Sequence, residues 1–303
     1  MKKIIITGAS GFLGYPTLLK MSQVYKDTEI FALYNNSSIT AINDNIIPIK
    51  INLMNESEYR RLPKSYDVVI HFAGQKETFL KNNSGLKQFD YNTQITKLLI
   101  PNMVKAHCKS MIYASSVYIY SGINQTPFVE KNLGIPNNYL GLSKLVCESL
   151  MRSYALEGVF NSICLRIFTV YGRQLSSKQF ITDAINRLQS NTEKEIFFNP
   201  KIHRDFIHID DVVESFINAM RYIEKQDADY FDSINVATGV STSIEDLIKI
   251  LIQLTNVKKK IKFRHSNYFS NDQDHIANIN KIKKLFNWSP KIDLYEGLKT
   301  IVK

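Results

Sequence analysis

The stretch that decides the fold is Thr7-Gly8-Ala9-Ser10-Gly11-Phe12-Leu13-Gly14, which directly follows a short apolar run at residues 3–7. The run is typical of a buried strand, and the residues after Gly14 are typical of a helix. Three glycines in this order permit a tight turn, a close approach of the backbone to a pyrophosphate, and close packing of helix on strand. The phosphates of a dinucleotide would cap the helix N-terminus. We therefore predict that Gly8, Gly11 and Gly14 form a dinucleotide-binding turn.

The first two-thirds of the chain alternates short β-branched runs with longer amphipathic stretches, a pattern typical of βαβ units. Each run is short and apolar, as expected of parallel strands that helices bury on both faces. The expected strands are residues 3–7, 29–34, 46–51, 67–72, 110–115 and 162–168. The predicted fold class is α/β, with a doubly wound parallel sheet of the Rossmann type.

The rhythm changes after Gly172 and indicates a second, smaller lobe. There we expect helices at residues 180–190 and 210–222, strands at 204–209 and 233–237, and a helix-rich, lysine-rich end. We predict a dinucleotide-binding Rossmann domain of residues 1–171 and 211–238. The predicted substrate-binding lobe is the smaller, C-terminal lobe and comprises residues 172–210 and 239–303.

The charge balance favours anionic partners. Lys and Arg number 38 against 28 Asp and Glu, a formal net charge of +10, which gives part of the surface a positive potential. The basic residues are scattered, and the densest run, residues 258–260 with Lys262, has no interleaved aromatic residues. We interpret this run as a solvated face and expect no nucleic-acid partner.

The cysteines and the N-terminus indicate a reduced compartment. Cys108, Cys147 and Cys164 are widely spaced and form no C-x-x-C pair, so neither a disulfide framework nor a metal site is expected. They are predicted to be reduced, mostly buried thiols. The N-terminal apolar stretch is too short for a signal peptide or a membrane span. We expect a cytoplasmic protein with no membrane association.

The residues after the second expected strand bear on the cofactor. An acid about 20 residues after the glycine turn would hold the ribose 2′-hydroxyl of NAD, whereas a basic residue would favour the 2′-phosphate of NADP. This chain has Tyr34-Asn35-Asn36 there. NAD and NADP both remain open.

The T-G-x-x-G-x-x-G spacing resembles the short-chain dehydrogenase/reductase superfamily, and further segments are similar to its extended branch. That branch comprises nucleotide-sugar epimerases, dehydratases and reductases. The similar segments are residues 67–74, Asn92 within 89–92, and residues 113–120, 165–172, 204–211, 235–239 and 286–290. The resemblance spans nearly the whole chain and implies an NAD(P)-dependent enzyme that acts on a nucleotide-diphosphate sugar, with polysaccharide biosynthesis as the family-level context.

The resemblance also implies the binding residues, without a metal. Arg204 resembles the arginine that grips the nucleotide diphosphate, for which a guanidinium offers bidentate contacts. Thr169 stands where many relatives carry a substrate-binding Asn, and Lys76 lies on the loop after the fourth strand. The implied substrate-binding residues are Lys76, Ser116, Thr169 and Arg204. The implied cofactor-binding residues are Gly8, Ser10, Gly11, Phe12, Leu13, Gly14, Asn35, Asn52, Leu53, Phe72, Ala73, Asn92, Tyr139, Lys144 and Ile167.

Hydride transfer between a sugar carbon and nicotinamide needs a group that takes or gives the hydroxyl proton. In the family a Tyr does this, and a Lys one helical turn later holds the ribose and stabilises the phenolate, because an ordinary Tyr has a pKa of about 10. A Ser or Thr hydrogen-bonds the substrate oxygen. Ser116, four residues before Tyr120, is assigned that role, and Ser115 takes it if the register differs by one.

The position of the Tyr departs from the family pattern Y-G-x-S-K. Here Tyr139-Leu140-Gly141-Leu142-Ser143-Lys144 places Leu140 where the Tyr belongs. Helix positions five apart differ by roughly 140°, so Tyr139 and Lys144 would not share a face of a regular helix. A helix that begins at or after Tyr139, or a π-type turn, would absorb the extra residue. We assign Tyr139 and Lys144 as catalytic with Ser116. The alternatives are that Tyr118 or another tyrosine transfers the proton, or that no tyrosine does.

The residues after Ser116 narrow the reaction. The 4,6-dehydratases of the family carry an Asp-Glu pair there, whereas this chain has Val117 and Tyr118, so dehydration is not expected. Epimerisation or reduction of a keto-sugar remains, with hydride transfer most readily at C4. The alternative function is a non-catalytic nucleotide-binding protein, because Leu140 replaces the usual Tyr.

Two further expectations concern packing. His71 and His208 lie inside apolar strand patterns and are predicted to be core histidines. Relatives commonly dimerise by pairing two long helices from each subunit, and residues 89–107 and 140–154 carry apolar residues at helical spacing. Such stripes more often face a core, so the expected homodimer rests mainly on the resemblance.

Overall fold

A computed structural model describes residues 1–40, 43–75, 84–173, 179–190, 192, 194–264 and 273–302. Its central feature is a seven-stranded sheet. The strands are β1 (Lys2–Thr7), β2 (Thr28–Tyr34), β3 (Ile46–Lys50), β4 (Val68–His71), β5 (Ser110–Ser116), β6 (Asn161–Ile167) and β11 (Phe231–Val236). Their order in the sheet is β11-β6-β5-β4-β1-β2-β3.

The helices and the remaining strands complete the element order. The helices are α1 (Gly14–Val24), α2 (Ser84–Lys105), α3 (Tyr139–Leu156), α4 (Phe180–Gln189), α5 (Ile209–Ile223), α6 (Ile244–Thr255), α7 (Asn280–Phe286) and α8 (Leu294–Lys299), with the 3₁₀ helices η1 (Glu56–Arg61) and η2 (Val117–Tyr120). The remaining strands form pairs: β7 (Thr169–Tyr171) with β10 (Phe206–His208), β9 (His203–Arg204) with β12 (Thr242–Ser243), and β8 (Lys194–Phe198) with β13 (Lys260–Arg264).

The sheet is doubly wound, as the sequence predicts. The pairs β1 with β2, β2 with β3, β1 with β4, and β4 with β5 are all parallel. The chain moves outward from β1 in one direction to β3 and in the other to β6. Such a reversal of strand order creates a crevice at the carboxyl ends of the strands, where ligands bind in open α/β sheets. The glycine turn follows β1 at this point.

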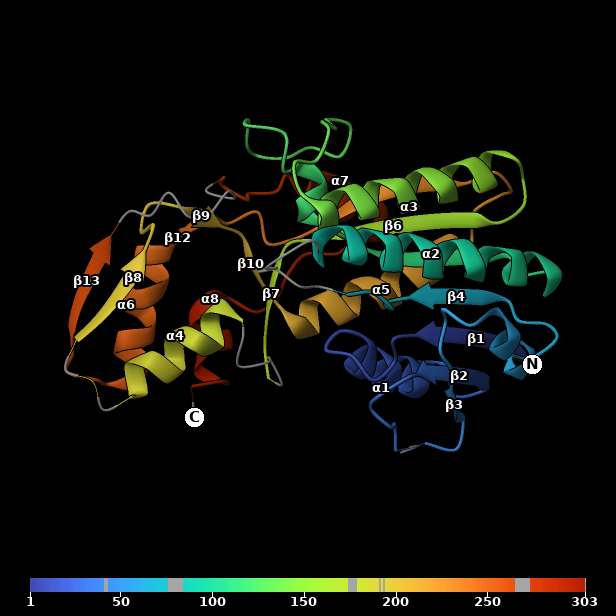
Figure 1. The fold of residues 1–303 in the computed structure, drawn as a ribbon, viewed down its shortest axis with the longest axis horizontal. Helices are drawn as coiled ribbons and strands as arrows, with labels where there is room; N and C mark the ends of the chain where they lie inside the picture. Colours follow the sequence, from blue (N-terminus) through green and yellow to red (C-terminus); the bar gives the residue numbers. More distant parts are fainter. Residues whose placement is uncertain are drawn as a thin grey trace. The chain divides into compact units, whose positions relative to one another are not determined.

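Apolar side chains bury both faces of the sheet. On one face, Ile5 and Val69 pack in a cluster with Ile95 of α2 and Cys147 of α3. α2 and α3 lie side by side along this face (Figure 1). Side chains alternate along a strand, so the buried Ile4 faces the other side, where α1 contacts β1 and β2. Cys108, Cys147 and Cys164 are buried free thiols, as predicted.

The chain divides into two compact units. The first comprises Met1–Ile123, Leu133–Arg166 and Val213–Ile234, and the second comprises Asn124–Asn132, Ile167–Val212 and Asn235–Lys303. The second unit has a core of its own, formed mainly by apolar side chains of α4 and α6 with Phe197 of β8. The excursion of residues 124–132 into the second unit was not anticipated by the sequence.

One strand prediction in the second unit needs correction, and one strand was not predicted. The expected strand at residues 204–209 is split into β9 and β10, because the buried Asp205 carboxylate accepts hydrogen bonds from the backbone of Thr238 and Gly239. The unpredicted strand is β13 in the lysine-rich run, in which exposed basic residues alternate with the partly buried Ile261 and Phe263. The exposed basic side chains are consistent with the interpretation of the run as a solvated face. None of the helices in the described ranges is long and apolar enough to cross a membrane.

Candidate active site

The glycine turn after β1 has a backbone that only small residues tolerate. Gly8 has φ +63°, and a Cβ there would lie 2.7 Å from the amide nitrogen of Ala73. A Cβ on Gly14 would overlap the carbonyl oxygen of Gly8. The turn is closed by a hydrogen bond of 2.9 Å from Gly11 N to Gly8 O. The order of roles predicted for the three glycines, turn, approach and packing, fits this geometry.

Phe72 and Ala73, at the end of β4, lie directly beside the turn. Thr7 Oγ1 fixes them there, because it accepts a hydrogen bond of 3.1 Å from Ala73 N and lies 2.6 Å from His71 Nδ1. Burial, and next the Lys144 cation, lower the pKa of His71 to about 3. His71 is therefore a neutral core histidine at ordinary pH, as predicted; His208 is also buried.

The start of α1 suits a pyrophosphate. Its N-cap, Leu13, offers no side-chain hydrogen bond, and the first turn holds no acidic residue. Tyr15 N donates to Gly11 O at 2.9 Å and Pro16 has no amide hydrogen, so the helix dipole, rather than the amides of these two residues, favours an anion here. Together with the close-packed glycines, this start forms a cradle that a Cβ would fill, so the residues present fit a dinucleotide. The half-buried Ser10 and Phe12 border it.

The other predicted cofactor residues follow β2 and β3. Asn35 is exposed directly after β2, and Asn52 is exposed after β3 beside the buried Leu53. A hydrogen bond of 3.0 Å from Ala9 N to Leu33 O ties the glycine turn to the end of β2. These residues therefore lie on the same edge of the sheet as the turn, where the carboxyl ends of parallel strands meet.

Ser116 ends β5 and begins η2. Its side chain is half-buried, and its Oγ accepts a hydrogen bond of 3.4 Å from Tyr118 N. Ser115, the alternative by one register step, is buried, and its Oγ has no hydrogen-bond partner among the described residues. Partial exposure at a strand end suits a hydroxyl that meets a ligand, and this favours Ser116 over Ser115.

Lys144 reaches from α3 to the same strand end. Its Nζ donates a hydrogen bond of 2.6 Å to the carbonyl oxygen of Ala114, two residues before Ser116. The ammonium also lies 4.4 Å from the ring centroid of the buried Tyr113, a distance typical of a cation–π contact. The structure therefore brings the Lys144 ammonium to β5 near its carboxyl end, and this strand ends at Ser116.

The N-terminus of α3 is regular. The helix begins at Tyr139, and the N-cap Asn138 accepts a hydrogen bond of 2.8 Å from Gly141 N through Oδ1. Every residue of the helix from Tyr139 on is α-helical, so the π-type turn is wrong. The helix starts at Tyr139 but is regular there, so Tyr139 and Lys144, five positions apart, lie on different faces of α3. A Cβ on Gly141 would overlap the carbonyl oxygen of Tyr118, so α3 packs closely against η2.

Tyr139 and Leu140 differ sharply in environment. The Leu140 side chain is 7% exposed, whereas Tyr139 is 50% exposed. The Tyr139 ring packs against the backbone of Gly85 in the first turn of α2, where an added Cβ would overlap the ring. An apolar side chain thus fills the position of the family Tyr, and the phenol of Tyr139 lies toward α2.

Asn92 of α2 is 2% exposed and holds the loop after β4. Its amide donates to Gln75 O at 3.1 Å and to Ser143 Oγ at 3.4 Å, and its Oδ1 accepts from Gln75 N at 2.7 Å. Asn92 therefore joins this loop to α3. Lys76, the next residue of the loop, lies outside the described residues.

The remaining predicted residues belong to the second unit. Ile167 is buried, whereas Thr169 and Arg204 are partly exposed. Thr169 N donates to Asp205 O at 3.1 Å, which places it next to Arg204 in the neighbouring segment. Arg204 Nη1 donates to Gln273 O at 2.6 Å. The two predicted substrate residues are therefore close neighbours.

Sequence reasoning gave no role to Thr7, Asn138 and Gly141. Thr7 stands directly before the glycines, Asn138 directly before the helix, and Gly141 inside the first helical turn. An Asn at a helix start and a Gly that is unfavourable inside a helix are signals that could have indicated a cap and a close approach. The role of Thr7 depends on β4 and carries no local signal.

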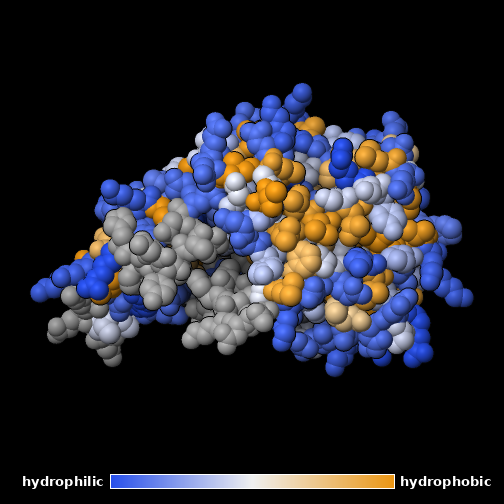
Figure 2. All heavy atoms as spheres, turned by 45° about the horizontal axis from the view of Figure 1, so that its top comes forward, coloured by the Kyte–Doolittle hydropathy of each residue, from blue (hydrophilic) through white to orange (hydrophobic). Residues whose placement is uncertain are grey.

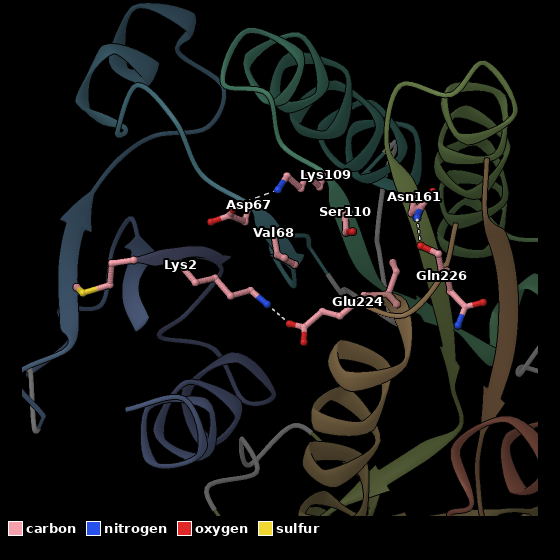
Figure 3. Close-up of a pocket in the computed structure, with 10 residues that line it drawn as sticks. Lys2, Asp67, Val68, Lys109, Ser110, Asn161, Glu224 and Gln226 are labelled. Atoms are coloured by element: carbon pink, nitrogen blue, oxygen red, sulfur yellow. Dashed lines mark hydrogen bonds and ion pairs between the residues drawn. The ribbon is translucent and has the colours of Figure 1, made fainter. Parts of the chain in front are cut away.

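A pocket of about 590 Å³ lies at the opposite edge of the sheet, at the amino ends of β1, β4 and β5 (Figure 3). Lys2 is directed toward Glu224, and Lys109 Nζ lies 3.9 Å from Asp67 Oδ1. These charged side chains, which line the pocket, therefore pair with one another. None of the predicted site residues lines this pocket. In the described part of the chain, no group of His, Cys, Asp and Glu side chains could hold a metal ion.

Comparison with known proteins agrees with this geometry. The chain is 24% identical to the dTDP-4-dehydro-6-deoxyglucose reductase of Escherichia coli, over 99% of this chain and 96% of the relative. It is 27% identical to the dTDP-D-glucose 4,6-dehydratase of Mus musculus, over 99% and 88%. The solved UDP-Glc/GlcNAc 4-epimerase of Campylobacter jejuni superposes with a TM-score of 0.85 at 25% identity, covering 100% of this chain and 98% of that one.

The family itself follows from the match of a sequence profile. The profile described as the NAD dependent epimerase/dehydratase family matches residues 4–237, which include the glycine turn, Ser116 and Lys144. Sugar-nucleotide epimerases, reductases and dehydratases are all similar to this chain over nearly its whole length. The chain therefore belongs to the NAD dependent epimerase/dehydratase family.

Proposed function

We propose that the chain is an NAD(P)-dependent nucleotide-sugar epimerase or keto-sugar reductase that acts at a ring carbon, most readily C4. The observation that carries the proposal is the bond from Lys144 Nζ to Ala114 O, which brings the ammonium near the carboxyl end of β5, the strand that ends at Ser116. The glycine turn follows β1 on the same edge of the sheet. A proton-handling group and a cofactor cradle on one edge suit oxidation or reduction of an alcohol.

The first unit is the proposed cofactor domain. Gly8, Gly11 and Gly14, with the helix dipole at the start of α1, would hold the pyrophosphate, and Lys144 would hold the nicotinamide ribose. The bound nicotinamide supplies the acceptor or donor of a hydride. Asn35 offers the adenosine ribose an uncharged side chain, so its position is compatible with NAD and with NADP.

Three side chains have proposed roles in proton handling. Ser116 Oγ would hydrogen-bond the sugar oxygen, and Tyr139 Oη would take or give its proton. The Lys144 ammonium would stabilise the phenolate, because a nearby cation favours the charged form of a Tyr. Tyr139 lies at the first position of α3, and its side chain is 50% exposed. Tyr118 is the alternative phenol.

The residues next to Ser116 support epimerisation or reduction over dehydration. Loss of water from a sugar needs groups that move protons at two further carbons, for which carboxyl groups are suited. Val117 is 4% exposed and apolar, and Tyr118 carries no carboxyl group. Among the proteins similar to this chain, the E. coli reductase and the C. jejuni 4-epimerase represent the two proposed reactions.

The second unit is the proposed substrate-binding unit. Arg204 and Thr169 lie in neighbouring segments there, and a guanidinium can bind a diphosphate in a bidentate manner. The proposed substrate is a nucleoside-diphosphate hexose, and UDP and dTDP sugars are the first to test because the similar proteins carry those nucleotides in their names.

The test is turnover of UDP-glucose, UDP-N-acetylglucosamine and dTDP-glucose, followed by anion-exchange separation of the products, with NADH or NADPH oxidation assayed on 4-keto sugars. Ser116→Ala should lower kcat by about 100-fold or more, since it removes a hydrogen bond at the reacting oxygen. Ser115→Ala is the matched control and should retain activity. Failure of the wild-type protein to convert any of these sugars, with cofactor bound, would instead support a non-catalytic nucleotide-binding protein.

We also propose a homodimer formed through α2 and α3. Hydrophobic side chains gather over the face on which these helices lie (Figure 2). Leu142, Val146 and Leu150 of α3 are only partly buried and follow one another at spacings of four residues, which places them on one side of the helix. Val146→Lys should convert a dimer to a monomer in analytical ultracentrifugation, whereas Lys20→Glu on α1 should not.

A further inference from the structure

A buried ion pair joins β6 to α3 in the first unit. Arg166 Nη2 lies 2.6 Å from Glu148 Oε2, and Arg166 Nε lies 3.1 Å from Oε1 and 3.2 Å from Oε2. Both side chains are nearly inaccessible, at 2% for Arg166 and 4% for Glu148. Such a contact is short, charge-assisted and geometrically specific. None of the roles assigned above uses it.

Two hydroxyl groups extend this cluster to other elements. Arg166 Nη1 donates a hydrogen bond of 2.9 Å to Tyr120 Oη in η2. Ser233 Oγ in β11 donates a hydrogen bond of 3.0 Å to Glu148 Oε2. Burial opposes the charge of Arg166, but Glu148 and Tyr120 outweigh it and raise the pKa of the guanidinium. The guanidinium of Arg166 therefore stays charged despite its burial.

The cluster connects the two segments that carry the proposed catalytic groups. Tyr120 lies four residues after Ser116, at the end of η2. Glu148 lies four residues after Lys144 on α3, so the two side chains share a face of the helix one turn apart. One guanidinium thus bonds the segment of Ser116 and the helix of Lys144 at the same time.

Stability alone does not explain such a cluster. Replacement of a buried ion pair by well-packed apolar side chains of similar volume is often neutral or stabilising, because desolvation offsets much of the attraction. What an ion pair with fixed partners supplies, and apolar packing does not, is a defined relative position of the elements that it joins. Small displacements of catalytic groups lower turnover steeply.

We propose that Arg166, Glu148 and Tyr120 are positioning residues that set the spacing between Ser116 and Lys144. The guanidinium holds η2 and α3 in register, so that the Ser116 hydroxyl and the Lys144 ammonium meet one substrate–cofactor pair. Ser233 bonds the same carboxylate from β11, so its hydrogen bond joins β11 to α3 and does not join η2 to α3. This proposal rests on the proposed function, which supplies the roles of Ser116 and Lys144.

The test compares two single hydroxyl removals. Tyr120→Phe breaks the bond from Arg166 to η2, and Ser233→Ala, the matched control, breaks the bond from β11 to Glu148. Tyr120→Phe should lower kcat at least tenfold, with KM and bound cofactor unchanged, and Ser233→Ala should keep kcat within about twofold of wild type. Equal kcat values for the two variants would overturn the proposal.

A paired substitution separates position from stability. Arg166→Met with Glu148→Leu removes both charges together and leaves no unpaired buried ion. The double variant should melt within a few degrees of wild type and still show kcat at least tenfold down. A double variant with wild-type kcat would show that the ion pair is only part of the core, and would overturn the proposal.

A substrate-free measurement keeps this test distinct from that of the proposed function. Hydrogen exchange of residues 117–120 and 139–144 reports how firmly η2 and the start of α3 are held. Tyr120→Phe should increase exchange in both segments, and Ser233→Ala should not. If no sugar is converted by the wild-type protein, the proposed function fails, and unchanged exchange in Tyr120→Phe would separately overturn the positioning role.

Discussion

The two halves of the candidate site, on one sheet edge, are specified in different ways. Beside β1 and β4, backbone geometry determines which residues are allowed. Gly8 has a positive φ, and a Cβ on Gly14 would meet the Gly8 carbonyl. Beside β5 and α3, the proposed chemistry depends on single side chains. Leu140 stands at the position of the family Tyr, and Tyr139 lies one residue earlier. Backbone geometry tolerates few residues at a position, whereas a catalytic phenol could be supplied from a neighbouring position.

The largest effect is expected at this shifted phenol. Tyr139→Phe should lower kcat by about 10²–10⁴-fold with little change in KM, which is the usual contribution of a general acid or base. Leu140→Tyr in that background should recover part of the loss, because it restores the family spacing to Lys144. Steady-state kinetics on the converted sugar measures both. A similar loss in Tyr118→Phe, with Tyr139→Phe at wild-type rates, would transfer the role to Tyr118.

The next largest effect is expected in the glycine turn. Gly14→Ala places a Cβ on the Gly8 carbonyl and must displace the backbone, so NADH affinity should fall about 100-fold, equivalent to about 3 kcal/mol. A Cβ on Gly11 would lie 3.1 Å from Gly8 O, so Gly11→Ala should lose less NADH affinity than Gly14→Ala. Fluorescence titration with NADH gives both affinities, and circular dichroism checks the fold. Equal affinities in both variants would contradict the close-packing role of Gly14.

Lys144 belongs to both halves and should affect both. Lys144→Met removes a charged donor to the ribose, so cofactor affinity should fall by about 10- to 100-fold, the range expected for a hydrogen bond to a charged group. The exposed Lys97 on α2 is the control, and Lys97→Met should bind as wild type. Isothermal titration with NAD and NADP tests this. If Lys144→Met bound NAD and NADP as tightly as the wild-type protein, Lys144 would not be a cofactor-binding residue.

The smallest effect concerns His71, which supports the backbone half. Folded His71 has a pKa of about 3, whereas unfolded histidine has a pKa of about 6.5. The unfolded chain therefore binds more protons between these values, so stability is full above pH 6.5 and falls as the pH drops toward 3. Between pH 7.5 and 5, the free energy of unfolding of His71→Asn, measured with urea, should fall by about 2 kcal/mol less than that of the wild-type protein. The control His107→Asn, at an exposed position, should show the same change in the free energy of unfolding with pH as the wild-type protein. If His71→Asn also showed the wild-type change, His71 would not be a neutral, buried histidine.

Most of the fold could be predicted because its signals are local. The apolar runs that became β1 and β2, and the glycines between them, carry their own periodicity and turn chemistry. β13 was missed because a lysine-rich sequence masks a strand that buries only one face. The split between β9 and β10 was missed because Asp205 bonds residues more than 30 positions away.

The arrangement of the candidate site was only partly predictable. Ser116 and Lys144 were expected together, and Lys144 Nζ bonds Ala114 O in β5, the strand that ends at Ser116. The α-helical start at Tyr139 depends on the Asn138 cap and on the contact of Gly141 with η2. The Asn and the Gly are local signals, but the element that Gly141 contacts depends on the fold. The cluster of Arg166 and Glu148 joins residues 18 positions apart in the chain. Long-range contacts of this kind appear only once the strands are assembled.

The central claim is that the chain carries a complete nicotinamide-dinucleotide site despite the displaced Tyr. The most direct test is to denature the purified protein, assay the released NAD(H) and NADP(H), and titrate the remaining sites with NADH and NADPH. The account predicts a total occupancy of one nicotinamide dinucleotide per chain, lost in Gly14→Ala. A wild-type protein that releases none and binds neither form would contradict it.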